Sequence, residues 1–249
     1  DRSQRLLAEY LSFGGYPKIV LAQTLDEKKA AIADIYESYL EKDIGSLLRL
    51  KKTENFTNLV RLLASQMGKL LNYSHLSSTL GLSEKTVKHY LWYLEKTYIG
   101  QRVSPFTRRF GKEIVKSPVF YFTDIGLANY ATKDFYLHDL PALGFHFQNM
   151  IYHRLKNSDV HYWRTKDGAE VDFVIDDSKS VVPIEVKLQS ISDQKITGGL
   201  ASFIKKYHPE KAYLVTLDYQ KEIMFETTKI IFLPYYLVEN QNFVTIQHK

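Results

Sequence analysis

Three residues in the C-terminal half of the chain combine types and a spacing that suit phosphate chemistry. Asp172 and Glu185 are followed at a short distance by Lys187. Carboxylate oxygens are the ligands that hard divalent cations such as Mg²⁺ or Mn²⁺ prefer in proteins. A lysine is charged at neutral pH and would contact a phosphate oxygen or a water instead of the metal. The three residues are therefore candidate catalytic residues, and the two carboxylates are candidate metal ligands.

Two predicted strands position these side chains. Residues 170–175 and 181–187 both alternate apolar with polar residues, the period of a strand that buries one face. The polar loop between them is short enough to close a hairpin. If Ile175 pairs with Val182, the same register sets Asp172 opposite Glu185. Facing carboxylates repel, and a divalent cation between them would turn that cost into a binding site.

A plainer interpretation stays open for the same residues. Glu185 and Lys187 lie two positions apart on one strand, so they could form an exposed salt bridge on a solvated face. In that case the pair would have no chemical role.

Composition limits the class of protein. The chain has 249 residues, enough for two or three domains, and it has no cysteine, which excludes disulfides and thiolate metal sites. This suits a reducing compartment, and we predict a cytoplasmic protein. No apolar run reaches the ~20 residues of a membrane helix, and no signal-peptide pattern is present. The chain begins with Asp1, so we interpret it as part of a longer protein.

The positive charge is concentrated in the middle of the chain. Residues 54–116 hold ten Lys or Arg and four Asp or Glu, a balance of +6, whereas the remainder holds 23 basic and 24 acidic residues. A local excess of this kind predicts a surface that binds a polyanion.

The same region reads as a helix-turn-helix. A helix over residues 74–80 would end at Gly81, which can adopt a left-handed turn, and Ser83 would cap the next helix. That second helix would bury Val87, Leu91 and Leu94. Its outward face carries Lys85, Thr86, Lys88, His89 and Trp92.

Two short strands at residues 98–103 and 119–122, with a basic loop between them, complete the pattern of a winged helix. Such domains commonly place the second helix in the major groove and the wing on the DNA backbone. The predicted DNA-binding residues are Lys85, Lys88 and His89 on the helix and Arg108, Arg109 and Lys112 on the wing. A scaffold for protein contacts is the alternative.

The rest of the chain divides around this block. Residues 1–53 form a helical segment with helices at 3–11 and 24–43, and Thr24 can cap the second helix with Glu27 three residues later. Residues 54–134, which include an amphipathic helix at 56–71, form the winged helix, and residues 139–249 form a third domain. Its pattern is αβββαβ, with helices at 143–156 and 192–207, and indicates a mixed sheet flanked by helices in an α/β (α+β) protein. No P-loop sequence occurs, so we expect no such nucleotide site in this chain.

The Asp172 and Glu185-Val186-Lys187 pattern resembles the PD-(D/E)xK nuclease superfamily, whose core places an Asp on one strand and Glu-x-Lys on the next. This resemblance implies a restriction-endonuclease-like domain and metal-dependent cleavage of phosphodiesters.

The whole chain also resembles the region that follows the ATPase core in a family of prokaryotic, often archaeal, AAA+ ATPases, the domain known as DUF4143. Five segments between residues 5 and 220 carry the resemblance: 11–17, 39–43, 86–95, 116–127 and 170–175. It implies a winged helix and a nuclease-like domain whose partners are DNA and an ATPase domain of the same longer protein, with no membrane association.

One position departs from that family. The first helix of the last domain usually carries Phe-Glu, and this chain has Phe147-Gln148. A neutral amide brings no charge to hold a metal, although Glu170, two residues from Asp172 on the same strand face, could compensate.

Three functions therefore remain open. The first is a DNA-binding region of an AAA+ ATPase whose nuclease-like domain is degenerate. The second is an active Mg²⁺- or Mn²⁺-dependent endonuclease that uses Asp172, Glu185 and Lys187, with Gln148 in place of the usual acid. The third is a module that docks on the ATPase or on another protein.

Overall fold

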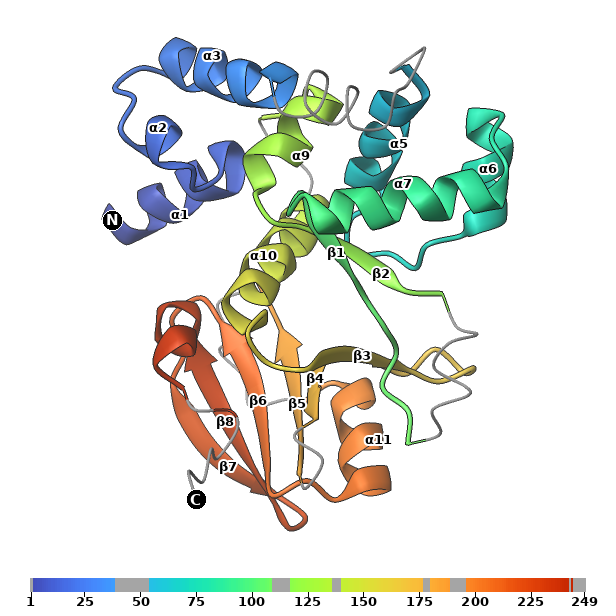
Figure 1. The fold of residues 1–249 in the computed structure, drawn as a ribbon. Coiled ribbons are helices and arrows are strands. Elements are labelled where there is room, and N and C mark those ends of the chain that lie inside the picture. Colours follow the sequence, from blue (N-terminus) through green and yellow to red (C-terminus); the bar gives the residue numbers. More distant parts are fainter. Residues whose placement is uncertain are drawn as a thin grey trace, which may run out of the picture. The chain divides into compact units, whose positions relative to one another are not determined.

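The computed structural model describes residues 2–38, 54–108, 117–135, 140–176, 180–188, 196–241 and 243 (Figure 1). They divide into two compact units, one formed by residues 1–102 and 119–149 and the other by residues 103–118 and 150–249. Within the described ranges, no helix combines the length and apolar character needed to cross a membrane. One boundary between the units falls after Asn149, inside helix α10 (Leu140–Leu155), whereas the domain predicted from the sequence begins at residue 139.

The first unit begins with three helices, α1 (Arg2–Phe13), α2 (Pro17–Val20) and α3 (Leu25–Tyr36). The predicted cap of α3 is confirmed, because the Thr24 hydroxyl accepts from the Glu27 backbone N–H and the Glu27 side chain accepts from the Thr24 N–H. The helix was expected to run to residue 43, but regular α-helix ends at Tyr36. Residues 39–53 lie outside the described part.

Helices α5 (Glu54–Ser65), α6 (Tyr73–Leu80) and α7 (Glu84–Lys96) follow. Gly81 ends α6 in the left-handed conformation, with φ +63°, and the Ser83 side chain accepts from the Thr86 N–H at the start of α7, as predicted. Helix α5 ends at Ser65, not at residue 71, and Gly68 has a positive φ of 74°. The predicted core residues of α7 are all buried: Val87, Leu91 and Leu94.

Strands β1 (Gly100–Val103) and β2 (Val119–Phe122) pair, and helices α9 (Ile125–Thr132) and α10 (Leu140–Leu155) follow. Figure 1 shows α9 between the α1–α3 group and α5. The Asp124 carboxylate accepts from the N–H groups of Gly15 and Gly126, so it joins the turn after α1 to the start of α9. Residues of α10 up to Asn149 belong to the first unit.

The second unit is built on one mixed sheet of six strands in the order β3-β4-β5-β6-β8-β7. Its strands are β3 (Val160–Arg164), β4 (Glu170–Asp176), β5 (Val181–Val186), β6 (Lys211–Thr216), β7 (Lys221–Phe225) and β8 (Thr228–Pro234). Pairs β5–β6 and β6–β8 are parallel, and the other pairs are antiparallel. The edge strand β7 was not predicted, because three of its five residues are exposed and its apolar pattern is weak.

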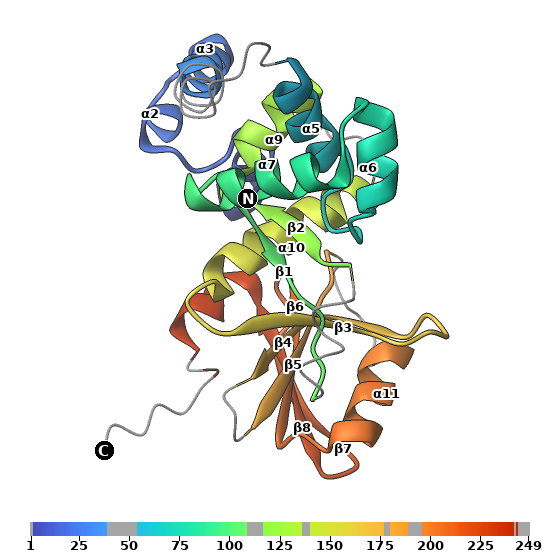
Figure 2. The same cartoon turned by 45° about the vertical axis from the view of Figure 1, so that its right-hand side comes forward.

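Helix α11 (Gly198–Tyr207) packs against β4 and β5, and the 3₁₀-helix η2 (Tyr235–Asn240) contacts β6 and β8 (Figure 2). Helix α11 was predicted to begin at residue 192. That prediction is wrong at residues 196 and 197, which the structure describes as non-helical: Thr197 is the N-cap, and the helix begins at Gly198. Residues 189–195 are outside the described part. The mixed α and β composition expected from the sequence is confirmed.

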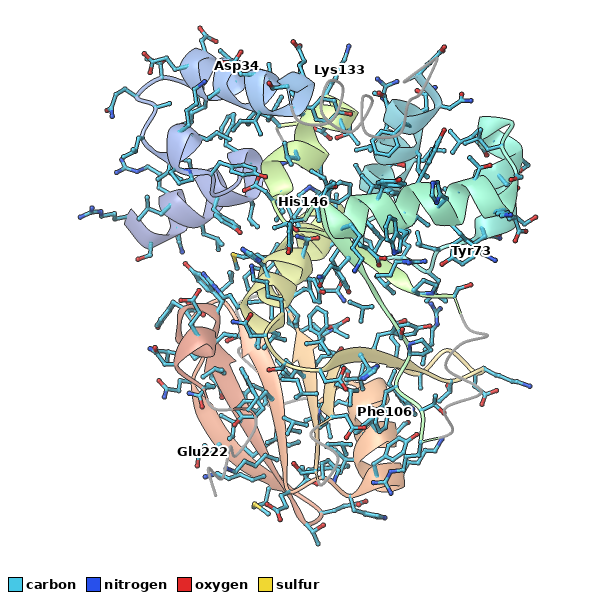
Figure 3. All side chains as sticks on the ribbon, in the orientation of Figure 1. Asp34, Tyr73, Phe106, Lys133, His146 and Glu222 are labelled. Carbon is cyan, nitrogen blue, oxygen red and sulfur yellow. The ribbon has the colours of Figure 1, made fainter. Side chains whose placement is uncertain are left out.

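The segment predicted as a wing packs within the second unit over its described residues. Pro105 bridges to Tyr162, and the Phe106 N–H donates to the Tyr162 carbonyl oxygen. The Phe106 ring is 4% exposed and contacts Phe203 and Tyr207 of α11 (Figure 3). An apolar ring at this position anchors the loop to a core, which a solvated wing would not require.

Candidate functional site

The register predicted for the β4–β5 hairpin is confirmed. Ile175 pairs with Val182, and Phe173 pairs with Ile184, the last pair of the ladder at this end. Beyond it, the Val186 N–H donates to the Asp172 side-chain oxygen Oδ2 at 2.8 Å, in place of a backbone carbonyl. The Asp172 carboxylate is therefore fixed at the end of the ladder, beside Glu185.

Strand β5 is buried on both faces, so Glu185 does not lie on a solvated surface. The residue is only 4% exposed, and its Oε1 accepts from Lys187 Nζ at 3.0 Å. Its second oxygen, Oε2, is buried without a hydrogen-bond partner among the described residues. The interpretation as a solvated salt bridge is wrong, because the predicted ion pair is present but its carboxylate is withdrawn from water.

Both carboxyl groups are shifted toward the protonated form. Burial raises the pKa of Asp172 well above its usual value, and the charge of Glu185 acts in the same direction. Burial also raises the pKa of Glu185, while Lys187 and the Thr197 hydroxyl oppose that shift. Burial lowers the pKa of Lys187, but the charges of Glu185 and Asp172 outweigh burial and raise it. Such an arrangement disfavours two bare negative charges and would be relieved by a cation.

Glu170, the third predicted metal ligand, acts on the pair through its charge, which raises the pKa of Asp172 and of Glu185. It is exposed, and its carboxylate lies 3.6 Å from Arg164 Nε. In the described part of the chain, no three His, Cys, Asp or Glu residues form a group that could hold a metal ion. The predicted metal site therefore consists here of Asp172 and Glu185.

Gln148, the fourth predicted catalytic residue, lies on α10, on the part of the helix that belongs to the first unit. It is buried, with 9% of its surface exposed.

Helix α11 closely approaches the start of β4. A Cβ added to Gly199 would stand 1.9 Å from the Glu170 carbonyl oxygen, so only glycine fits there. Thr197, the N-cap of α11, is the residue whose hydroxyl acts on Glu185. The sequence analysis missed both residues, although the Gly198-Gly199 pair is a signal of close backbone contact.

The predicted DNA-binding residues of the first unit share the exposed face of α7. Lys85, Lys88 and His89 are all exposed. Lys88 Nζ lies 3.7 Å from Glu84 Oε2 and 4.9 Å from the centroid of the Tyr73 ring, which is labelled in Figure 3. Lys96, which the sequence analysis did not single out, extends this face and lies 5.8 Å from the ring of the exposed Trp92.

Of the three predicted wing residues, the structure describes Arg108. Arg108 is exposed and lies over the Tyr207 ring at 5.8 Å, within the second unit. Arg109 and Lys112 lie outside the described residues.

One basic residue of the central block has a structural role instead. Arg102 on β1 donates to both oxygens of Glu95 on α7, at 2.8 Å and 2.6 Å, and to the Tyr73 hydroxyl at 3.4 Å. Glu95 and Tyr73 raise the pKa of Arg102, although burial opposes them. This clamp sets the position of α7 against β1 and α6.

Known relatives match the chain along most of its length. An uncharacterized protein of Haemophilus influenzae is 24% identical over 253 residues, which cover 94% of this chain and 58% of that protein. An uncharacterized protein of Mycobacterium tuberculosis is 26% identical over 185 residues, which cover 71% of this chain and 42% of that protein. The chain thus spans about half the length of the curated relatives it matches.

A crystal structure of a protein from Vibrio cholerae aligns with 94% of this chain and 58% of its own, at 14% identity and a TM-score of 0.25. Residues 143–236 match the family model described as Domain of unknown function (DUF4143), so the predicted DUF4143 domain is confirmed for these residues and not for the N-terminal part of the chain. Residues 4–137 match a separate model, Domain of unknown function (DUF8612). Since this second model covers more than half of the chain, the protein belongs to the DUF8612 family and carries a C-terminal match to DUF4143.

Proposed function

We propose that the protein binds DNA through the exposed face of α7. The observation that carries the proposal is the division of this helix into two faces. Val87, Leu91 and Leu94 pack in the core of the first unit, and the opposite face presents Lys85, Lys88 and Lys96 to solvent. With the short turn at Gly81 and the β1–β2 pair, this arrangement resembles a winged helix, in which the second helix contacts DNA.

Two other basic residues of the central block are engaged in contacts within the first unit. Arg61 donates to the Ala131 carbonyl oxygen, and Arg102 is held by Glu95, so both have structural partners. Besides these two, the described basic residues that the central block contributes to the first unit are Lys69 and the three lysines of α7, all of which are exposed and can contact phosphates. Phosphate contacts of this kind supply affinity that does not depend on sequence and falls with salt.

A salt titration tests this proposal. Binding of a fluorescein-labelled DNA would be followed by anisotropy at several NaCl concentrations. The double variant Lys85→Ala/Lys88→Ala should weaken binding and reduce the slope of log K against log[salt] by about 1.5 to 2. The matched control is Lys211→Ala/Lys221→Ala, two exposed lysines of the second unit. An unchanged slope in the first double variant would exclude α7 as the binding face.

A second function is favoured by one specific observation, the buried Glu185 Oε2 without a partner in the described residues. The β3-β4-β5 order, the following α11 and the parallel β6 resemble the PD-(D/E)xK nuclease core. Asp172 and Glu185 would hold Mg²⁺ or Mn²⁺, and Lys187 would contact a phosphate oxygen of the DNA. When bound, such a metal activates water and stabilises charge on the phosphate.

The residues fit a cation only in part. Two carboxylates, one of which has a buried oxygen without a hydrogen-bond partner in the described residues, suit a hard metal. No group of three acidic or His ligands occurs in the described residues, and Gln148 adds no charge. We therefore propose weak cation binding and weak or no cleavage.

Calorimetry with MnCl₂, alongside digestion of single-stranded, duplex and branched DNA, tests this second function, with Asp172→Ala as the control. Weak Mn²⁺ binding that is lost in the variant is expected. Strong cutting that disappears in the variant would show an active nuclease. Identical behaviour of the two proteins toward Mn²⁺ would exclude the metal site.

The link to an AAA+ ATPase is also a proposal, drawn from the family resemblance. Docking on that ATPase or on another partner is the third function, and it would gain support if the salt titration detected no DNA binding.

A further inference from the structure

Three aromatic side chains gather on the exposed face of α7. The rings of His89 and Trp92 are parallel within 6°, with centroids 6.3 Å apart. The Tyr93 ring stands nearly perpendicular to both, at 4.8 Å from His89 and 5.0 Å from Trp92. We call these three residues the aromatic platform.

The three rings of the aromatic platform differ in their exposure to solvent. Tyr93 is half-buried, whereas His89 is exposed and Trp92 keeps 45% of its surface in water. Positions 89, 92 and 93 are neighbours on one helical face. Burying the exposed part of Trp92 would be favourable, and the parallel Trp92 and His89 rings suit a ligand that is flat.

Cations flank the platform at both ends. Lys85 lies one helical turn before His89, and Lys96 lies one turn after Trp92, with its Nζ 5.8 Å from the Trp92 ring. The two acidic residues of α7 do not compete, because Glu95 is bound by Arg102 and Glu84 lies beside Lys88. Aromatic faces between positive charges match a chain of flat bases joined by phosphates.

Stacking on the rings of the aromatic platform would distinguish single-stranded from double-stranded DNA. In a duplex each base stacks on its neighbours and offers only its edges in the grooves. An aromatic ring can stack on a base only where that base has left the duplex or was never paired. Because bases in a strand stack parallel to one another, two parallel rings can receive consecutive unpaired bases.

We propose that the aromatic platform binds unpaired bases, and that α7 thus recognises single-stranded DNA or unpaired stretches within a duplex. This inference rests on the DNA binding proposed above and specifies its substrate. His89 and Trp92 supply the stacking faces, Tyr93 fixes their orientation, and Lys85 and Lys96 contact the phosphates on either side.

Fluorescence binding assays test the proposal with two probes, oligo(dT) and a duplex of equal length. Trp92→Ala should weaken binding of oligo(dT) about tenfold, as expected for the loss of one stacked base, and change duplex binding less than twofold. Trp92→Phe, which keeps an aromatic face, should retain most of the affinity. Tyr236→Ala is the matched control, since that residue is 55% exposed on η2 of the second unit.

Intrinsic fluorescence gives an independent signal. The chain has two tryptophans, and Trp163 is only 4% exposed, so quenching by added oligo(dT) would report on Trp92. Quenching that disappears in Trp92→Phe supports stacking on that ring. The residual signal of Trp163 also shows whether each variant is folded.

The outcomes distinguish this inference from the broader function. Duplex binding that depends on Lys85 and Lys88, with oligo(dT) binding no tighter and unaffected by Trp92→Ala, would overturn the platform and leave DNA binding intact. The absence of binding to either probe would overturn both.

Discussion

The backbone N–H of Val186 donates to the Asp172 carboxylate at 2.8 Å, where the β4–β5 ladder has just ended. A side chain thus takes the position of a strand carbonyl, and the acid cannot turn away without leaving an N–H unsatisfied. This bond keeps Asp172 next to Glu185 even though their charges repel. The hairpin therefore holds two carboxylates close together, and a bound cation would relieve their repulsion.

Asp172→Asn should therefore stabilise the metal-free protein at neutral pH. Burial and Glu185 raise the pKa of Asp172 in the folded state, so the folded state binds more protons than the unfolded state above pH ~4. The stability of the wild type consequently falls as pH rises through that window. At pH 8 the variant should unfold at a higher temperature, and its free energy of unfolding should exceed that of the wild type by on the order of 1 kcal/mol. This difference in stability should vanish near pH 4.

Thermal unfolding in EDTA at pH 4, 6 and 8 measures this effect. Asp218→Asn removes a carboxylate from an exposed loop position and serves as the control. A loss of stability in Asp172→Asn at pH 8 would mean that the charged carboxylate is favourable where it stands.

Gly199 should tolerate no side chain, although its neighbour should. A Cβ at position 199 would meet the Glu170 carbonyl oxygen at 1.9 Å, whereas one at Gly198 meets nothing within 4 Å. Gly199→Ala should lower the free energy of unfolding by roughly 2 kcal/mol, because α11 must move away from β4. Gly198→Ala should be neutral or stabilising by up to about 1 kcal/mol. Urea unfolding of both variants makes the comparison, and equal effects would contradict the close contact.

The sequence was informative where local rules decide the structure. The β4–β5 register followed from two alternating strands and a short loop, and it placed Asp172 beside Glu185. The caps at Thr24 and Ser83 and the left-handed Gly81 followed from side-chain chemistry within a few residues. Each of these features depends on contacts close in the chain, which a sequence displays directly.

The sequence failed where distant packing decides. Helix α11 begins at Gly198, and its first turn closely approaches Glu170. The Gly198-Gly199 pair indicates a close backbone contact, but it does not show which residue the helix meets. Phe106 packs on Phe203 of α11 and Arg108 lies over the Tyr207 ring, and the sequence around residue 106 shows neither contact. The aromatic platform was visible only as single residues, since ring orientation depends on three-dimensional geometry.

Gly81 should resist β-branched replacement because of its backbone conformation alone. Its φ of +63° is left-handed, and a Cβ there meets nothing within 4 Å, so no steric clash complicates the result. Gly81→Val should lower the free energy of unfolding by about 1 to 2 kcal/mol, while Gly81→Asn should cost less, because Asn tolerates this region. If urea unfolding found the two variants equal, strain at this turn would be insignificant.

The Arg102–Glu95 clamp should depend on the shape of the guanidinium and not only on its charge. Arg102 binds both Glu95 oxygens and the Tyr73 hydroxyl, and the Arg102 and Glu95 side chains are about three-quarters buried, with 25% and 22% exposed. Lysine keeps the charge but cannot form the paired hydrogen bonds, so Arg102→Lys should cost about 1 to 3 kcal/mol of unfolding free energy. Arg164→Lys is the matched control, because its contact with Glu170 is longer, 3.6 Å, and the side chains are 45% and 59% exposed. There we expect a change below about 0.5 kcal/mol, as for most surface ion pairs. Equal losses at the two positions in chemical denaturation would show that the planar geometry at Arg102 adds nothing to the stability of α7.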